Sequence, residues 1–174
     1  NWGNEVYKPT YITQHTLNLT GGSEVGRYLV SFDYLDQPGL IENTEYQRYS
    51  YRVNTDLNIG KMLKVSSDVT YRHIDRLWSE SLGSVQYEVW SMQPTSPVKY
   101  ENGDYRLDKQ NRNAISLMDM DVVGEDRYNK DVVYGQVKAD FEPIKDLVFT
   151  GMASLNGSWD RRKIHYKNYK YYNE

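Results

Sequence analysis

Long stretches of this 174-residue chain alternate between apolar and polar residues, and this period of two constrains the fold more than any other feature. In one such stretch, Tyr49, Tyr51 and Val53 share a face, whereas Arg48 and Arg52 lie on the opposite face. Successive side chains of a β-strand point to opposite sides, so the pattern predicts strands. The polar face must meet either bulk water or the wet interior of a barrel.

Six segments carry this alternation, and several of them are ten residues or longer. Strands of soluble sheets usually have about five or six residues, whereas a tilted strand needs about 9–11 to cross a bilayer. The lengths therefore favour strands that span a membrane. The predicted strands are residues 14–20, 27–36, 46–58, 63–74, 128–142 and 147–160, with a further strand in the Tyr-rich tail.

The connections between these segments alternate between short and long. Residues 21–26, 60–62 and 143–146 are short, residues 37–45 are longer, and residues 75–126 are very long. In an antiparallel meander every second connection lies at the same end, so the short turns gather at one end of the sheet. Outer-membrane barrels have short periplasmic turns and long extracellular loops. The sequence predicts an all-β antiparallel meander of this kind.

Composition excludes several other classes of protein. The mean hydropathy is −0.80, yet aromatic residues make up 14% of the chain, which disfavours disorder. Tyrosine dominates, with 17 Tyr against 3 Phe, and suits surfaces that are apolar at one end and wet at the other. The net charge of −3 disfavours a nucleic-acid partner, and the lack of cysteine excludes disulfides and thiolate metal sites.

The long connection, residues 75–126, is predicted to carry a short helix within 77–93, ended by Pro94, and a tight turn at Asn102-Gly103. Loops of this length are usually functional. Large aromatic side chains dominate binding energetics, so we expect this loop to contact a ligand. The competing interpretation, favoured slightly for each tryptophan, is packing within the loop or on the rim. The candidate residues are Trp78, Tyr87, Trp90, Tyr100 and Tyr105.

Catalytic and metal-binding patterns are weak in this chain. The three histidines are far apart in sequence, which favours strand-face or solvated positions. Asp119, Asp121 and Gly124 match part of a calcium loop, but Val123 and Lys130 occupy positions that require oxygen ligands. We therefore expect no enzyme, no metal and no cofactor.

Several motifs together resemble a known family. They are Trp2 with Glu5, then LNLTGGSE, YLDQPGLIENTEYQRYSYRVN and LKVSSDVTYR, and later MQPTSPVKYENGDY and YGQVKADFEPIKDLVFTG. This combination resembles the barrel strands of SusC/RagA-type TonB-dependent outer-membrane transporters, the nutrient importers of Bacteroidetes-like bacteria. Met62 departs from the aromatic residue often found before LKV.

The resemblance implies that residues 1–174 are a partial barrel wall in the bacterial outer membrane, without the plug and the remaining strands. It implies import of a glycan or oligopeptide with a SusD-like surface lipoprotein, and energy from TonB through the plug region. Side chains of one face would meet lipid, and those of the other would line the lumen. The lipid-facing residues would include Tyr51, Val53, Val65, Val69 and Phe149, and the lumen-facing residues Arg48, Arg52, Asp56 and Lys64.

Two other functions stay open on the sequence alone. One is a TonB-dependent receptor for an iron chelate or a cobalamin. The other is a soluble carbohydrate-binding β-sandwich with aromatic platforms, against which the sorted loop lengths count.

Overall fold

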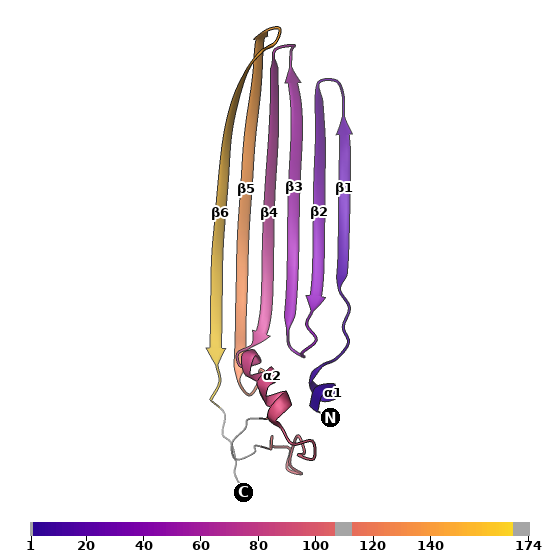
Figure 1. Ribbon diagram of the computed structural model, residues 1–174, viewed down its shortest axis with the longest axis vertical. Helices are drawn as coiled ribbons and strands as arrows, with labels where there is room; N and C mark the ends of the chain where they lie inside the picture. The colour runs from indigo at the N-terminus through magenta and orange to yellow at the C-terminus, as the bar shows by residue number, and fades with distance from the viewer. Residues whose placement is uncertain (1, 107–112, 169–174) are drawn as a thin grey trace.

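The computed structural model describes residues 2–106 and 113–168, and its main feature is one antiparallel sheet of six strands (Figure 1). The strands lie in the sheet in sequence order, so each pairs with the next along the chain. The predicted meander is therefore confirmed, and the sandwich alternative is wrong, because these six strands form a single layer. The elements are α1 (Trp2–Val6), β1 (Thr13–Gly22), β2 (Gly26–Pro38), β3 (Glu45–Ile59), β4 (Leu63–Ser79), α2 (Leu82–Ser91), β5 (Gly124–Ile144) and β6 (Leu147–Tyr166).

The three short turns lie together at one end of the sheet, called here the turn end (Figure 1). Gly60 and Asp146 adopt positive φ angles of 66° and 68° in two of these turns. The β2–β3 connection, both helices, and residues 80–106 and 113–123 lie at the opposite end, called here the mouth end (Figure 1). The predicted separation of short turns from the long loop is confirmed.

The strands are longer than predicted toward the mouth end. Alternation fades after residue 74, yet backbone pairing continues, with Leu77 opposite Arg127 and Trp78 opposite Asp126. The long connection is consequently shorter than the predicted 75–126, because β4 ends at Ser79 and β5 begins at Gly124. Strand β6 also extends beyond residue 160 to Tyr166, and residues 169–174 of the Tyr-rich tail lie outside the described residues.

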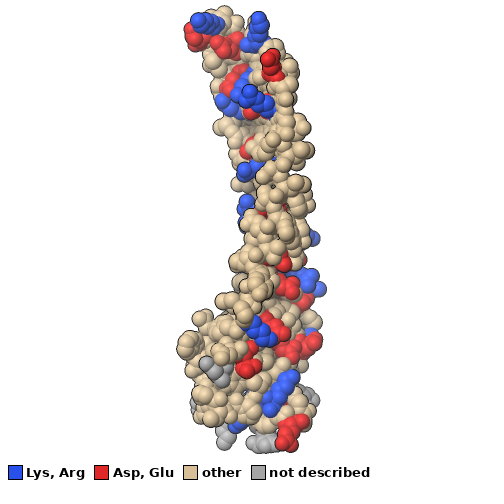
Figure 2. Space-filling view, turned by 90° about the vertical axis from the view of Figure 1, so that its right-hand side faces the viewer, with Lys and Arg blue, Asp and Glu red and all other residues tan. Residues whose placement is uncertain are grey.

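One face of the sheet is apolar across all six strands. The register aligns Leu17 with Phe32, Phe32 with Tyr51, and Tyr51 with Tyr71, so the alternating sets of successive strands coincide. Leu17, Tyr51 and Tyr71 are exposed and Phe32 is half-buried, as on a barrel wall whose surroundings would cover these side chains. Viewed from the β1 edge, charged side chains gather toward the two ends and leave the middle largely uncharged (Figure 2).

The apolar face forms a band of defined height. A row is here the set of residues that lie opposite one another across successive strands. The band begins, at the turn end, with the row that includes Phe141 and Phe149. It ends, toward the mouth, with the row that includes Tyr49 and Trp159. On β6 the ten residue steps from Phe149 to Trp159 span about 33 Å along the strand. With the usual tilt of barrel strands, the band is about 25 Å tall, which matches the apolar belt of transmembrane barrels.

Aromatic rings mark the mouth-end border of this band. The rings of His15, Tyr34, Tyr49 and His73 follow one another across four strands, with centroid separations of 6.4, 5.0 and 6.3 Å. One row deeper, the rings of Phe32, Tyr51 and Tyr71 are 5.1 and 6.1 Å apart. Aromatic girdles at this position are typical of the interface between membrane and water.

A compact cap at the mouth end contains the buried hydrophobic core of the described residues. It is formed by α1, α2 and the loop residues 80–106 and 113–123, and it includes the predicted short helix as α2. Helix α1 was not predicted, because five residues are too few to show helical periodicity. The core residues are Trp2, Val6, Val85, Met92, Ala114, Leu117, Met118 and Val123.

Candidate functional site at the mouth end

A pocket opens between the cap and the mouth end of the sheet. Its volume is about 470 Å³, and its walls come from the chain after α1, the β2–β3 connection, the end of β4 and the start of α2. Such a concave, mostly apolar hollow with few polar groups is the usual form of a small-ligand site. It is lined by Tyr7, Gln37, Gly39, Leu40, Ile41, Thr44, Glu45, Tyr46, Trp78 and Leu82.

The β2–β3 connection is held rigidly beside this pocket. The Gly39 N–H donates to the Thr44 carbonyl at 2.8 Å, and the Thr44 hydroxyl donates to the Ile41 carbonyl at 2.5 Å. A Cβ on Gly39 would lie 2.0 Å from the Thr44 hydroxyl oxygen, so the turn requires glycine there. The Asn43 side-chain amide donates to the Met118 carbonyl at 2.9 Å and ties the turn to the cap.

Trp78 reaches the pocket from the polar face of β4 and contacts a stacked cation. The Arg76 guanidinium lies 3.8 Å from the centroid of the Trp78 ring and 4.9 Å from that of Tyr128. Asp126 is buried and accepts two short bonds from Arg162, at 2.9 and 2.6 Å. The Nε of Arg76 is buried without a hydrogen-bond partner in the described part of the chain. This cluster of Arg76, Trp78, Asp126, Tyr128 and Arg162 was not predicted. The one sign of it in the sequence is that charged and aromatic residues occur together at the ends of the longest strands.

The other four predicted contact residues divide between exposed and packed positions. Tyr87 and Trp90 lie three residues apart on the outer face of α2, 68% and 81% exposed, so they form an open aromatic surface. Tyr105 is half-buried, its hydroxyl donates to Asp119 at 2.8 Å, and Lys99 lies 4.4 Å from its ring. Tyr100 is half-buried beside the tight turn at Asn102-Gly103. Contact of any of the five with a ligand stays a prediction.

Tyr105 also has the most strongly shifted acidity of the cap. Burial, together with its bond to Asp119, raises the pKa of the Tyr105 hydroxyl to about 12. Asp119 accepts the Asp121 N–H at 2.8 Å, and Lys167 lowers the pKa of Asp121 by a 2.8 Å hydrogen bond. The carboxylates of the partial calcium motif are therefore engaged with protein groups, Asp119 within the cap and Asp121 with Lys167 after β6. Among residues 2–106 and 113–168, no cluster of His, Asp or Glu could hold a metal ion.

The four residues predicted to line the lumen share the polar face of the sheet. Arg48 forms an ion pair with Asp33 at 3.0 Å, and Arg52 donates to the Thr70 hydroxyl at 3.4 Å. The register also places Asp56 and Lys64 on this face, opposite the apolar band. The residues predicted to meet lipid all lie on the apolar face; they are Tyr51, Val53, Val65, Val69 and Phe149.

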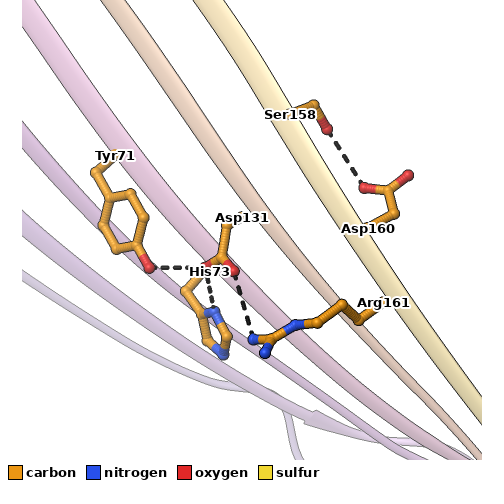
Figure 3. A network of polar contacts seen from close by, with 6 residues as sticks. All are labelled: Tyr71, His73, Asp131, Ser158, Asp160 and Arg161. Carbon is orange, nitrogen blue, oxygen red and sulfur yellow. Dashed lines mark hydrogen bonds and ion pairs between the residues drawn. The ribbon is translucent and has the colours of Figure 1, made fainter.

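A polar network on the apolar face was not predicted from the sequence. Asp131 accepts a hydrogen bond from the Tyr71 hydroxyl at 2.7 Å, pairs with His73 Nδ1 at 2.7 Å, and lies 3.8 Å from Arg161 (Figure 3). It lies at the mouth-end border of the band, in the row of Tyr49 and His73. Nearly sixty residues separate His73 from Asp131, so only the strand register reveals that they are neighbours.

Among the helices of residues 2–106 and 113–168, none is long and apolar enough to cross a membrane.

Comparison with known proteins identifies similar sequences and folds. No protein-family model matches the chain. It is 29% identical over 106 residues to the TonB-dependent receptor P26 of Formosa agariphila, covering 60% of this chain and 10% of that receptor. It is 32% identical over 69 residues to the TonB-dependent receptor P3 of the same organism, covering 40% and 7%.

Solved structures of the RagAB peptide transporter share the fold. One matches with a TM-score of 0.75 and 22% identity, over 92% of this chain and 19% of the solved chain. Another, the RagAB peptide importer in the open-open state, matches with a TM-score of 0.76 and 21% identity. This match covers 99% of this chain and 20% of the solved chain. The chain thus spans only about a fifth or less of the proteins it matches. In sequence and in fold, it is similar to part of the transmembrane barrel wall of SusC/RagA-type TonB-dependent transporters.

Proposed function

We propose that this chain forms part of the wall of a bacterial outer-membrane transporter, which imports a nutrient with energy from TonB. The observation that carries the proposal is the single-sided apolar band, about 25 Å tall, with a folded cap at only one of its ends. A cap on the extracellular side is well placed to meet cargo and a SusD-like surface lipoprotein. The similarity to receptors named TonB-dependent supports the energy source.

An oligopeptide is the cargo that the mouth-end pocket suits best. Leu40, Ile41 and Leu82 give it aliphatic walls, while Glu45 provides a charged group at its border. Such a hollow suits an apolar side chain flanked by peptide groups, which need hydrogen-bonding partners. The neighbouring folds, described as a peptide transporter and a peptide importer, support the same class.

A glycan is the second candidate, and a different surface supports it. The exposed rings of Tyr87 and Trp90 on α2 are flat apolar faces of the kind that stack on sugar rings. These rings lie on the outer side of α2, whereas Leu82 and Trp78 line the pocket. The two cargo classes therefore predict effects at different residues.

Uptake by cells that express the full-length transporter tests the proposed function. Labelled oligopeptides, oligosaccharides, ferric chelates and cobalamin are supplied separately, with and without functional TonB. We expect oligopeptide uptake that requires TonB, with the peptide recovered chemically unchanged from the periplasm because the proposed role involves no catalysis. Uptake that persists without TonB, or a cargo that arrives cleaved by the transporter, would contradict the proposal.

Substitutions at the mouth distinguish the cargo surfaces. Trp78→Ala should reduce peptide uptake, whereas the paired change Tyr87→Ala and Trp90→Ala should reduce glycan uptake or lipoprotein association. Gln86→Ala, an exposed position of the same helix, is the matched control. Unchanged uptake and unchanged lipoprotein association in all three variants would exclude the mouth as the contact surface.

A further inference from the structure

Three cations form an exposed cluster on the outer side of the sheet, just beyond the apolar band. Arg127 of β5 and Lys163 of β6 lie directly opposite each other, and Arg161 lies next to them on β6. All three alternate in step with Trp159, so they share the face of the apolar band. They are named here the basic cluster, which consists of Arg127, Arg161 and Lys163.

The basic cluster lacks the neutralising partners that the opposite face of the same strands provides. On the polar face, Lys130 lies 3.7 Å from Asp160, and Arg162 lies 2.6 Å from Asp126. The side chains of Arg127 and Lys163 form no ion pair with another described residue. Like charges directly across a strand pair are destabilising, so this arrangement favours an anion bound between them.

Among the described residues, Arg161 is the one member of the cluster that has a carboxylate within ion-pair distance. Asp131 is 3.8 Å from Arg161 but is shared with Tyr71 and His73, and the Arg161 side chain remains 76% exposed (Figure 3). The other carboxylates of this end of the face lie at the sides of the cluster. Glu45 and Asp75 border a small hollow with Arg127, Asp36 lies farther away on β2, and Glu125 lies in the next row beside His165.

Arg161 lies at the height of the lipid headgroups above the band, and the row of Lys163 and Arg127 lies a few Å beyond them. Arg161 and Lys163 lie two and four residues beyond Trp159, about 5 and 10 Å above the band for tilted strands. The headgroup layer occupies roughly 5–7 Å on each side of the hydrocarbon core. Long basic side chains can also bend along the apolar surface toward a charge at that depth.

We infer that the basic cluster binds the phosphate groups of lipid headgroups in the extracellular leaflet. The inference rests on the proposed placement in a membrane, with the cap outside. A phosphate between Arg127 and Lys163 would remove their repulsion, and Arg161 would supply a further charge-assisted hydrogen bond. The cluster thereby fixes the depth of the wall in the bilayer and selects anionic lipid around β5 and β6.

The test uses the full-length transporter in nanodiscs of phosphatidylcholine that contain a minor share of phosphatidic acid. The preference for phosphatidic acid is measured with spin-labelled lipids, in the wild type and in the triple variant Arg127→Gln, Arg161→Gln and Lys163→Gln. The matched control removes three exposed cations from the polar face: Arg52→Gln, Lys64→Gln and Arg72→Gln.

We expect the wild type and the control to prefer phosphatidic acid about fivefold or more, since each cation near an anionic surface contributes on that scale. The basic-cluster variant should lose most of this preference while its uptake of cargo is retained. Three outcomes would overturn the inference. The wild type could show no preference for phosphatidic acid, the basic-cluster variant could keep the wild-type preference, or the control could lose as much of it as that variant. Lipid preference that persists when TonB-dependent uptake is absent would instead contradict only the proposed function.

Discussion

In the cap, Leu117 and Val6 are completely buried, whereas on the sheet Leu17 and Leu155 each leave 69% of their surface exposed. The cap buries its apolar side chains against one another, as a small soluble domain does. The sheet exposes its apolar side chains to the surroundings. These side chains stabilise the sheet only if the surroundings are apolar. The two regions therefore depend on different environments, although one continuous chain builds both.

The largest expected effect comes from removing volume from the core of the cap. Leu117→Ala should destabilise the cap by about 2–5 kcal/mol, because the surrounding side chains cannot fully close the cavity. Limited proteolysis of the folded transporter should show faster cleavage within residues 80–106 and 113–123. The same substitution at the exposed Leu155 should leave cap cleavage unchanged. Equal protection of the cap in wild type and Leu117→Ala would contradict the assignment of the core.

A charge placed on the apolar band should have a similar effect on the sheet alone. Val53 lies in the middle rows of the band, opposite Val30 and Val69. Val53→Lys should cost about 2–4 kcal/mol in a bilayer if this row lies near the membrane midplane. Asn54→Lys, one residue along on the polar face, should be nearly neutral. Folding yields in lipid vesicles measure the difference, and equal yields would reverse the assignment of the faces.

A buried amide in the cap provides a smaller, isosteric test. Asn113 is completely buried; its amide donates to the Val98 and Arg106 carbonyls at 2.7 and 3.1 Å, and its oxygen accepts the Ile115 N–H at 2.9 Å. Asn113→Asp replaces the donor with an acceptor facing two carbonyls, which should cost about 1–3 kcal/mol. The exposed Asn102→Asp is the control. Hydrogen exchange in the cap should increase for Asn113→Asp only, and unaltered exchange would exclude the network.

The smallest expected effect depends on pH. The pKa of Tyr105 is raised to about 12 from an ordinary value near 10, so the folded cap holds this proton more tightly than the unfolded cap. That stabilisation is complete below pH 10 and is lost as the pH rises through about 12. Tyr105→Phe should remove this part of the alkaline loss of cap protection and cost about 1 kcal/mol at neutral pH. A variant with an unchanged alkaline profile would show that another group is responsible.

The sheet was predictable from sequence because alternation is a local signal. The spacing of Tyr49 and Val53 alone shows that they share a face. The short polar connections between successive strands indicate that neighbours in sequence pair in the sheet. The strand ends were harder, because Leu77 and Arg127 pair without alternation in their neighbourhood. In that zone the strands extend beyond the apolar band, so the surroundings no longer require one face to be apolar.

The cap and its pocket were not predictable, for the opposite reason. Helix α1 contacts α2 across about eighty residues of sequence, and Asn43 reaches Met118. No local periodicity encodes such contacts. Sequence did identify the aromatic residues of the loop, but it could not separate Trp78, which lines the pocket, from Trp90, which is exposed on the far side of the helix.

The joining of α1 to the distant core of the cap also sets an order of assembly. Each strand pairs with its sequence neighbour, so the sheet can grow hairpin by hairpin through short loop closures. Trp2 and Val6, in contrast, pack in the same core as Val85 and Leu117, which follow four complete strands later in the chain. Contacts of such long range form late. The core of the cap therefore forms after β1–β4 have paired. It can form only when these four strands bring α1 close to α2.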